Sequence, residues 1–180
     1  MQDTNIRFFE RGLQLVQGSG DLKTALAQLV QLAAEEANST SASFYVVDTK
    51  ENVLKPLVTY GVPEAYVEAC GDVRSGDQCC GRAVHYRKPW ILSDMLKDPM
   101  FESAKAAALV SPIRAGFSVP VIAQSGECLG ALGCHYSEPY MPSPEQIGRN
   151  HNWAAMIADA ICPYKESPGA HSAQGDPQVA

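Results

Sequence analysis

The sequence predicts an α+β domain built on a central, mostly antiparallel sheet. Two apolar runs, Ala115–Ala123 and Cys128–Tyr136, are joined by the short turn Gln124–Glu127 in the pattern of a β-hairpin. Helical patterns lie at both ends of the chain, and an irregular, charged segment leads from residue 71 to residue 111. We therefore expect the terminal helices on one face of the sheet and loops with short helices on the other, where they cover a cavity.

Length and composition bound the class of protein. At 180 residues the chain is one domain with room for a tail. The net charge of −6 argues against nucleic-acid binding, which needs a basic surface. No membrane span and no signal peptide are recognisable, so we expect a cytoplasmic protein that makes no contact with a membrane. In that compartment the six cysteines are expected to be reduced thiols.

Two helices are expected before the first strand. Residues 1–20 carry apolar side chains at a heptad-like spacing: Ile6, Phe9, Leu13 and Val16. After the break at Gly18-Ser19-Gly20, a second apolar stripe follows: Leu22, Leu26, Leu29 and Ala33. Packing on the chain's own sheet explains the second helix. For the first helix, a dimer contact and packing within the chain both stay open.

Strands and short helices are expected between residues 43 and 110. Two strands, Ser43–Asp48 and Val53–Tyr60, are followed by a short helix at Pro63–Ala69. The covering segment should contain a helix, a short strand, a loop and an alanine-rich helix: Cys79–Tyr86, Trp90–Leu92, Asp94–Pro99 and Phe101–Val110.

The last helix has a well-formed start. Ser143 is placed to cap it, Pro144 takes the first helical position and Gln146 completes a capping box. Pro163 is expected to end this helix. The domain then spans residues 21–162, and residues 163–180, rich in Pro, Gly, Ser, Ala and Gln, are expected to be a disordered tail.

The order of these elements, with Gly126–Tyr136 following a Ser-x-Pro strand, resembles a GAF domain over about residues 22 to 162. The motifs stand in the order of a subgroup attached to sensor histidine kinases and cyclic-di-GMP enzymes: Pro63–Tyr66, Cys80–Ala83, Asp94 with Asp98-Pro99, Arg114-Ala115, Ser118–Pro120 and Glu138–Pro142. The resemblance implies a GAF-like sheet and a module that binds small molecules or proteins in signalling.

A narrower likeness concerns His135. The segment Gly133–Tyr140 is similar to the part of bacterial phytochrome GAF domains in which a histidine contacts the bilin. The Asp-Ile-Pro motif of phytochromes is absent, as is a Cys-His pair before the hairpin, so His135 is interpreted as a pocket residue rather than as evidence of a chromophore. Cys134 and His135 are neighbours on a strand and point to opposite faces, which prevents them from chelating one metal ion.

Cys79 and Cys80 start a predicted helix close to Arg82. A helix N-terminus and a nearby guanidinium favour a thiolate, which predicts a redox-sensing or ligand-contacting thiol. The alternative is a small apolar side chain packed beneath the covering segment. GAF proteins that reduce free methionine sulfoxide carry a cysteine in the loop before the hairpin, whereas residues 98–110 contain none.

Polar residues near the hairpin are the other ligand-binding candidates. Arg114 is expected either to meet an acidic ligand or to pair with Asp94 or Asp98 and hold the loop. By alternation Ser118 shares a face with Arg114, and Phe117 lies on the opposite face. The sequence does not decide which face lines the cavity, so both Phe117 and Ser118 are candidates.

We therefore predict a GAF-type sensory or regulatory domain that is not an enzyme, with Cys80, Asp94, Arg114, Phe117, Ser118 and His135 at the ligand site. An unidentified small molecule, a second copy of the chain, and a histidine kinase or cyclic-di-GMP enzyme are the expected partners, and no cofactor is specified. The rivals are a thiol-based sensor or reductase using Cys79 and Cys80, a haem or bilin sensor using His135, His85 or His151, and a dimerisation module without a ligand.

Overall fold

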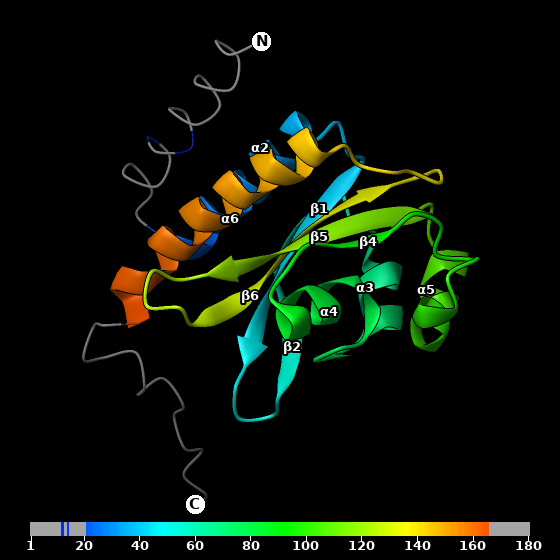
Figure 1. Ribbon diagram of the computed structural model, residues 1–180, viewed down its shortest axis with the longest axis horizontal. Helices are drawn as coiled ribbons and strands as arrows, with labels where there is room; N and C mark the ends of the chain where they lie inside the picture. Colours follow the sequence, from blue (N-terminus) through cyan, green and yellow to red (C-terminus); the bar gives the residue numbers. More distant parts are fainter. Residues whose placement is uncertain (1–11, 13, 15–20, 166–180) are drawn as a thin grey trace, which may run out of the picture.

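A six-stranded antiparallel sheet forms the centre of the computed structural model, which describes residues 12, 14 and 21–165 (Figure 1). The strands stand in the spatial order β3-β2-β1-β6-β5-β4. Their bounds are β1 Ser41–Asp48, β2 Val53–Tyr60, β3 Val73–Arg74, β4 Trp90–Leu92, β5 Ala115–Ile122 and β6 Cys128–Tyr136. The predicted α+β class is confirmed.

The expected hairpin is formed by β5 and β6. Gly126 takes a φ of +87° in the turn, a conformation that glycine adopts without a Cβ penalty, and its N–H donates to Ala123 O. The two strands pair from Ala115 opposite Tyr136 down to Ile122 opposite Cys128. Of the sheet, only the two-residue strand β3 has no counterpart among the expected elements, because it is too short to show a periodic pattern.

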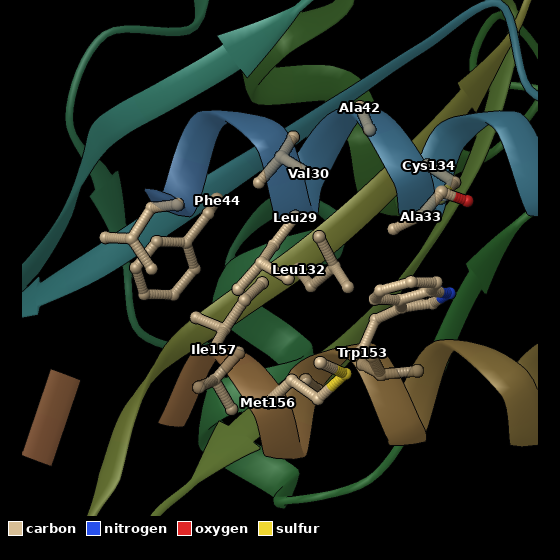
Figure 2. Packing of buried hydrophobic residues seen from close by; sticks show 14 of the residues in the cluster. Leu29, Val30, Ala33, Ala42, Phe44, Leu132, Cys134, Trp153, Met156 and Ile157 are labelled. Atoms are coloured by element: carbon tan, nitrogen blue, oxygen red, sulfur yellow. The ribbon is translucent and has the colours of Figure 1, made fainter. Parts of the chain in front are cut away.

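The terminal helices α2 (Leu22–Glu36) and α6 (Pro144–Lys165) cover one face of the sheet (Figure 1). Their buried side chains interlock with those of β1 and β6, and Figure 2 shows this core around Leu29, Phe44, Leu132 and Ile157. The core of this face is formed mainly by branched and aromatic side chains that water does not reach, which is the dominant stabilising contribution in such a domain.

Helix α6 begins as predicted and ends later than predicted. Ser143 Oγ accepts a hydrogen bond from Gln146 N–H, and Gln146 Oε1 accepts one from Ser143 N–H, which is the reciprocal capping box. The expected stop at Pro163 is wrong, because α6 continues to Lys165. A proline in the last turn removes one hydrogen bond, and its fixed φ is compatible with a helix. The helix can therefore continue past it. The rest of the expected tail, residues 166–180, lies outside the described residues.

The opposite face of the sheet carries the shorter helices: α3 (Glu64–Cys70), α4 (Gln78–Tyr86), the 3-10 helix η1 (Pro99–Ala104) and α5 (Lys105–Leu109) (Figure 1). The single helix expected at Phe101–Val110 is therefore split. Its first turns take the tighter 3-10 form, in which Phe101 N–H donates to Asp98 O three residues back. We call α3, α4, the loop 93–98 and η1 the roof.

Gly12 shows where part of the N-terminal region lies. It is helical and buried, and a Cβ on it would come within 2.8 Å of Trp153 on α6 and 3.3 Å of Leu29 on α2. At this position the chain packs on its own helix pair. The rest of the first predicted helix, apart from the exposed Gln14, lies outside the described residues.

Candidate functional site

A small cavity lies between the sheet and the roof. Its volume is about 20 Å³, which is room for about one water molecule. The sheet contributes side chains from β1, β5 and β6, and the roof contributes the remainder. The lining residues are Ser43, Tyr45, Tyr66, Cys70, Gln78, Cys79, Cys80, Met95, Phe101, Ser118 and His135.

Alternation along the strands separates this cavity from the core beneath the helices. On β6, His135 lines the cavity whereas Cys134 is buried among the residues that pack on α2 and α6. On β5, Ser118 lines the cavity and Phe117 belongs to the helix-side core. The expectation that Cys134 and His135 point to opposite faces is confirmed.

Phe117, which was expected at the ligand site, lies outside the lining of the cavity. Its side chain is fully buried on the helix side, where its ring is stacked 6.5 Å from that of Tyr136. The physical reason is the pleat: once Ser118 faces the cavity, its neighbour must face the helices.

His135 is contacted by one residue of β1 and one residue of α3. Ser41 Oγ lies 3.4 Å from Nδ1, and the Tyr66 ring lies 6.0 Å away at a tilt of 54°. The surrounding protein withholds water from the imidazole, and this desolvation lowers the pKa of His135 to about 4. The side chain is therefore neutral at pH 7 and can act as both a donor and an acceptor.

The start of α4 brings two thiols and an amide to the cavity. Asp77 precedes the helix and accepts a hydrogen bond from Gln78 N–H, while the Gln78 amide donates to Cys70 O at 3.3 Å. Gln78 has a φ of +49°, an uncommon backbone conformation for a residue with a side chain. The Cys79 thiol donates to Trp90 O at 3.3 Å.

The expectation of a thiolate at Cys79 or Cys80 is not supported by their surroundings. Burial raises the pKa of Cys79 to about 12, and the nearby Arg82 offsets only part of this effect. Burial likewise raises the pKa of Cys80 and brings that of Cys70 to about 11. All three are neutral thiols at pH 7, the state in which cysteine is a poor nucleophile.

Asp94 and Arg114 form an ion pair that lies away from the cavity. Arg114 Nη2 donates to both carboxylate oxygens of Asp94, at 2.8 and 3.0 Å, and Nε adds a third bond at 3.2 Å. This guanidinium holds the pKa of Asp94 below its usual value. Of the two expectations for Arg114, the pair that holds the loop is the one observed.

Asp94 instead faces an open surface groove of about 600 Å³, which we call the outer groove. Roof-loop residues form one side of it, and residues 139–141 form the other. Three of the six expected site residues, Cys80, Ser118 and His135, thus share the cavity, and Asp94 and Arg114 lie together outside it.

Several cavity residues were not among those expected. Ser43 and Tyr45 alternate with buried Phe44 on β1. Because successive strand residues point to opposite faces of the sheet, alternation identifies both residues once the face toward the cavity is known. Tyr66, Met95 and Phe101 come from three separate roof segments, and only their packing brings them together.

The remaining candidates lie elsewhere. His85 is exposed on α4 beside Tyr86, and His151 is exposed on α6. Within residues 21–165, no three His, Cys, Asp or Glu side chains are grouped so that they could hold a metal ion. No helix in the described part of the chain has the length and apolar character needed to cross a membrane.

Comparison with known proteins gives consistent matches. A family model described as "GAF domain" matches residues 19–160. The methyl sulfide methyltransferase-associated sensor of Methanosarcina acetivorans is 24% identical over 152 residues, which are 82% of this chain and 15% of that protein. The chain therefore spans only a small part of its curated relative.

Solved structures show the same fold. The GAF domain of an Acinetobacter phosphoenolpyruvate-protein phosphotransferase has a TM-score of 0.76 at 16% identity, covering 92% of this chain and 97% of that one. The free methionine-R-sulfoxide reductase of Neisseria meningitidis, solved with its substrate, has a TM-score of 0.74 at 19% identity, covering 89% and 90%. At such identities the likeness concerns the fold alone.

Proposed function

The chain belongs to the GAF domain family, which supplies sensory and regulatory domains, and from this premise we propose that it binds a small molecule in the cavity and transmits occupancy to the helix pair α2 and α6. The observation that carries the proposal is the direct bonding of a cavity residue to the turn that follows α2. Thr40 N–H and Thr40 Oγ1 both donate to His135 O at 3.0 Å.

A second set of bonds ties the same strand to both helices. Tyr136, next to His135 on β6, donates its hydroxyl to Ala37 O at the end of α2, at 3.1 Å. The Gln146 amide in the first turn of α6 donates to the same oxygen at 3.2 Å. A displacement of β6 by a ligand would therefore reach the ends of both helices through direct hydrogen bonds of 3.0 to 3.2 Å.

The size of the cavity defines what binding requires. Sites for small molecules usually have volumes of several hundred Å³, whereas this one has about 20 Å³. A ligand would have to move the roof outward, and ligand binding would favour that arrangement over the one described here. The loop 93–98, held by the pair of Asp94 and Arg114, is the segment next to the outer groove.

The setting that we propose follows from the family. The domain would act in the cytoplasm as a homodimer through its terminal helices, and would control a histidine kinase or a cyclic-di-GMP enzyme. Sedimentation velocity at micromolar protein tests the dimer, and a monomer at all concentrations would contradict that part of the proposal.

The test of ligand binding is a thermal-shift screen of charged and neutral metabolites, followed by hydrogen exchange with each stabilising compound. A bound ligand raises stability in proportion to its occupancy. We expect slower exchange in the roof, in residues 37–41 and in the first turn of α6. Stabilisation with protection confined to the roof would contradict transmission, and no stabilisation by any compound would contradict binding and favour a dimerisation module.

The variant Gln146→Glu tests how occupancy of the cavity is transmitted to the helices. Glutamate keeps an oxygen for Ser143 N–H and so retains the capping box, but it cannot donate to Ala37 O. We expect unchanged ligand affinity and an unchanged response at residues 37–41, which bond directly to β6, but a smaller change in exchange in the first turn of α6. Equal protection in both proteins would show that this bond takes no part.

The thiol rival has one observation in its favour, since Cys70, Cys79 and Cys80 line one cavity. Their raised pKa values oppose it. Replacement of Cys79 and Cys80 by serine should leave the ligand response intact, and a lost response would favour the thiol sensor. A visible absorbance band after expression with haem or biliverdin would favour the pigment-based sensor.

A further inference from the structure

The cavity lining differs from an ordinary polar site in having no ionic side chain. Among the described residues that line it, none is Asp, Glu, Lys or Arg. The polar groups are hydroxyls, an amide, thiols and the imidazole of His135. The site can donate and accept hydrogen bonds, and it has no fixed charge to pair with an ionic ligand.

The titratable groups of the lining do not supply a charge either. His135 is neutral because desolvation lowers its pKa to about 4, and the thiols are neutral because burial raises their pKa values. Burial also raises the pKa values of Tyr45 and Tyr66 above their ordinary value. At pH 7 the whole lining is uncharged.

The charged groups near the roof are engaged outside the lining. Arg82 is a buried residue of α4, whose Nε donates to Gly76 O at 3.2 Å and whose guanidinium lies 5.4 Å from the centre of the Trp90 ring. Asp94 is paired with Arg114 at the outer groove. An ion that entered the cavity would lose its hydration and gain no counter-charge from the lining.

We propose that the cavity selects small uncharged molecules that carry one or two hydrogen-bonding groups on a polarisable or apolar body. This inference rests on the proposed function and names the class of ligand for the same site. Transferring an unpaired ion from water into such a site is strongly unfavourable, whereas a neutral polar group recovers its hydrogen bonds from Ser43, Ser118 or Gln78. Sulfur atoms of Met95 and the cysteines supply the polarisable wall.

The inference also separates this site from that of an amino-acid reductase. Free methionine sulfoxide is a zwitterion at pH 7, with an ammonium and a carboxylate that each need a partner when they are buried. The described lining offers neither a carboxylate nor a cation. Dimethyl sulfoxide presents the same sulfoxide group without those charges.

Two matched pairs of small molecules test whether the cavity prefers uncharged ligands, a preference that we call the charge rule. Acetamide and acetate have nearly the same shape and differ in charge. Dimethyl sulfoxide and free methionine sulfoxide share the sulfoxide group, and only the second carries an ammonium and a carboxylate. Each is titrated into protein labelled with ¹³C in its methionine methyl groups. Met95 reports on the cavity, Met141 on the outer groove and Met156 on the helix-side core.

We expect the neutral member of each pair to shift the Met95 signal saturably at about millimolar concentration, with the Met156 signal unchanged. The charged member should bind at least about a hundredfold more weakly at this methyl. Shifts of Met141 alone would place the probe in the outer groove and count against the proposal.

Two results would contradict the proposal, and only the second would also contradict ligand binding in the cavity. Equal or larger shifts of Met95 with acetate or methionine sulfoxide would overturn the charge rule and leave ligand binding in the cavity intact. A silent Met95 with all four probes, together with no hit in the thermal-shift screen, would overturn both the charge rule and the proposed function. A control variant, Met141→Leu, should leave the Met95 response unchanged, because Met141 is exposed in the outer groove.

Discussion

His135 is the residue at which the proposed ligand site and the contacts to the helices come together. Its imidazole lines the cavity, while its carbonyl oxygen accepts two hydrogen bonds from Thr40. Because the ring is desolvated, the charged form is unfavourable in the folded state. This property has a measurable effect on stability.

The pKa of His135 predicts a loss of stability in mild acid. The ordinary value is 6.5 and the folded value is about 4, so between these limits the unfolded chain binds more protons and the free energy of unfolding falls as the pH falls. The full effect is about 3 kcal/mol. Urea unfolding at about pH 7.5 and at about pH 4.5 measures the decrease in the free energy of unfolding between the two pH values. This decrease should be about 2 kcal/mol smaller in His135→Asn than in the wild type.

The control for this experiment is His151→Asn, which removes an exposed histidine from α6. Its stability should fall with pH as much as that of the wild type. Identical falls in all three proteins would mean that His135 is not desolvated in the folded state.

At this scale the sequence allows part of the site to be predicted. Strand alternation separates Ser118 from Phe117 and His135 from Cys134, but the two faces of β5 are both apolar enough to be buried, so the face toward the cavity cannot be chosen. Arg114 could be assigned only to one of two roles, because its partner Asp94 is twenty residues away in the chain and joins it through the loop geometry.

Helix α4 is the element that sets the position of the roof thiols, and a glycine lets it approach the sheet edge. A Cβ at Gly81 would lie 2.2 Å from the backbone oxygen of Arg74 in β3. Gly148, also inside a helix, has no neighbour within 4 Å of such an atom. The two positions form a matched pair for one substitution.

Gly81→Ala should destabilise the protein by about 1–3 kcal/mol, because the backbone of β3 cannot yield to the new methyl group. Gly148→Ala should stabilise it by up to about 1 kcal/mol, since alanine is the better helix former and the site is open. Urea unfolding of both variants measures the difference. Equal effects would show that α4 does not approach β3 as closely as described.

The elements themselves are largely predictable from local chemistry. The hairpin, β2, β4 and the capping box at Ser143 follow from apolar runs, turn residues and cap residues that act within a few positions. The late end of α6 and the 3-10 turns of η1 do not, because packing against the sheet and the roof decides them.

The whole molecule has three layers, with the roof, the sheet and the helix pair, and residue 12 lies on the outer side of that pair. Gly12 fits between Leu29, Trp153 and Met156, where a Cβ would come within 2.7 Å of the Met156 methyl. This contact bears on how the N-terminal region and a dimer would share the helix surface.

Gly12→Val should lower the free energy of unfolding by about 1–3 kcal/mol, because the Trp153 ring must move to admit the side chain. Gln14→Ala, an exposed position in the same segment, should have little effect. Urea unfolding measures stability, and sedimentation velocity shows whether the released helix surface changes self-association. Equal stability of the two variants would mean that the N-terminal segment is not packed there.

The alternation of β1, β5 and β6 has a consequence for how new specificities could arise in this fold. Ser43, Ser118 and His135 face the cavity, while Phe44, Phe117 and Cys134, one position away from each, face the helices. The surface that we propose for recognition and the surface that we propose for transmission are thus formed by alternate residues of the same three strands. Changing the first set could retune which molecule is detected while the second set keeps the same output.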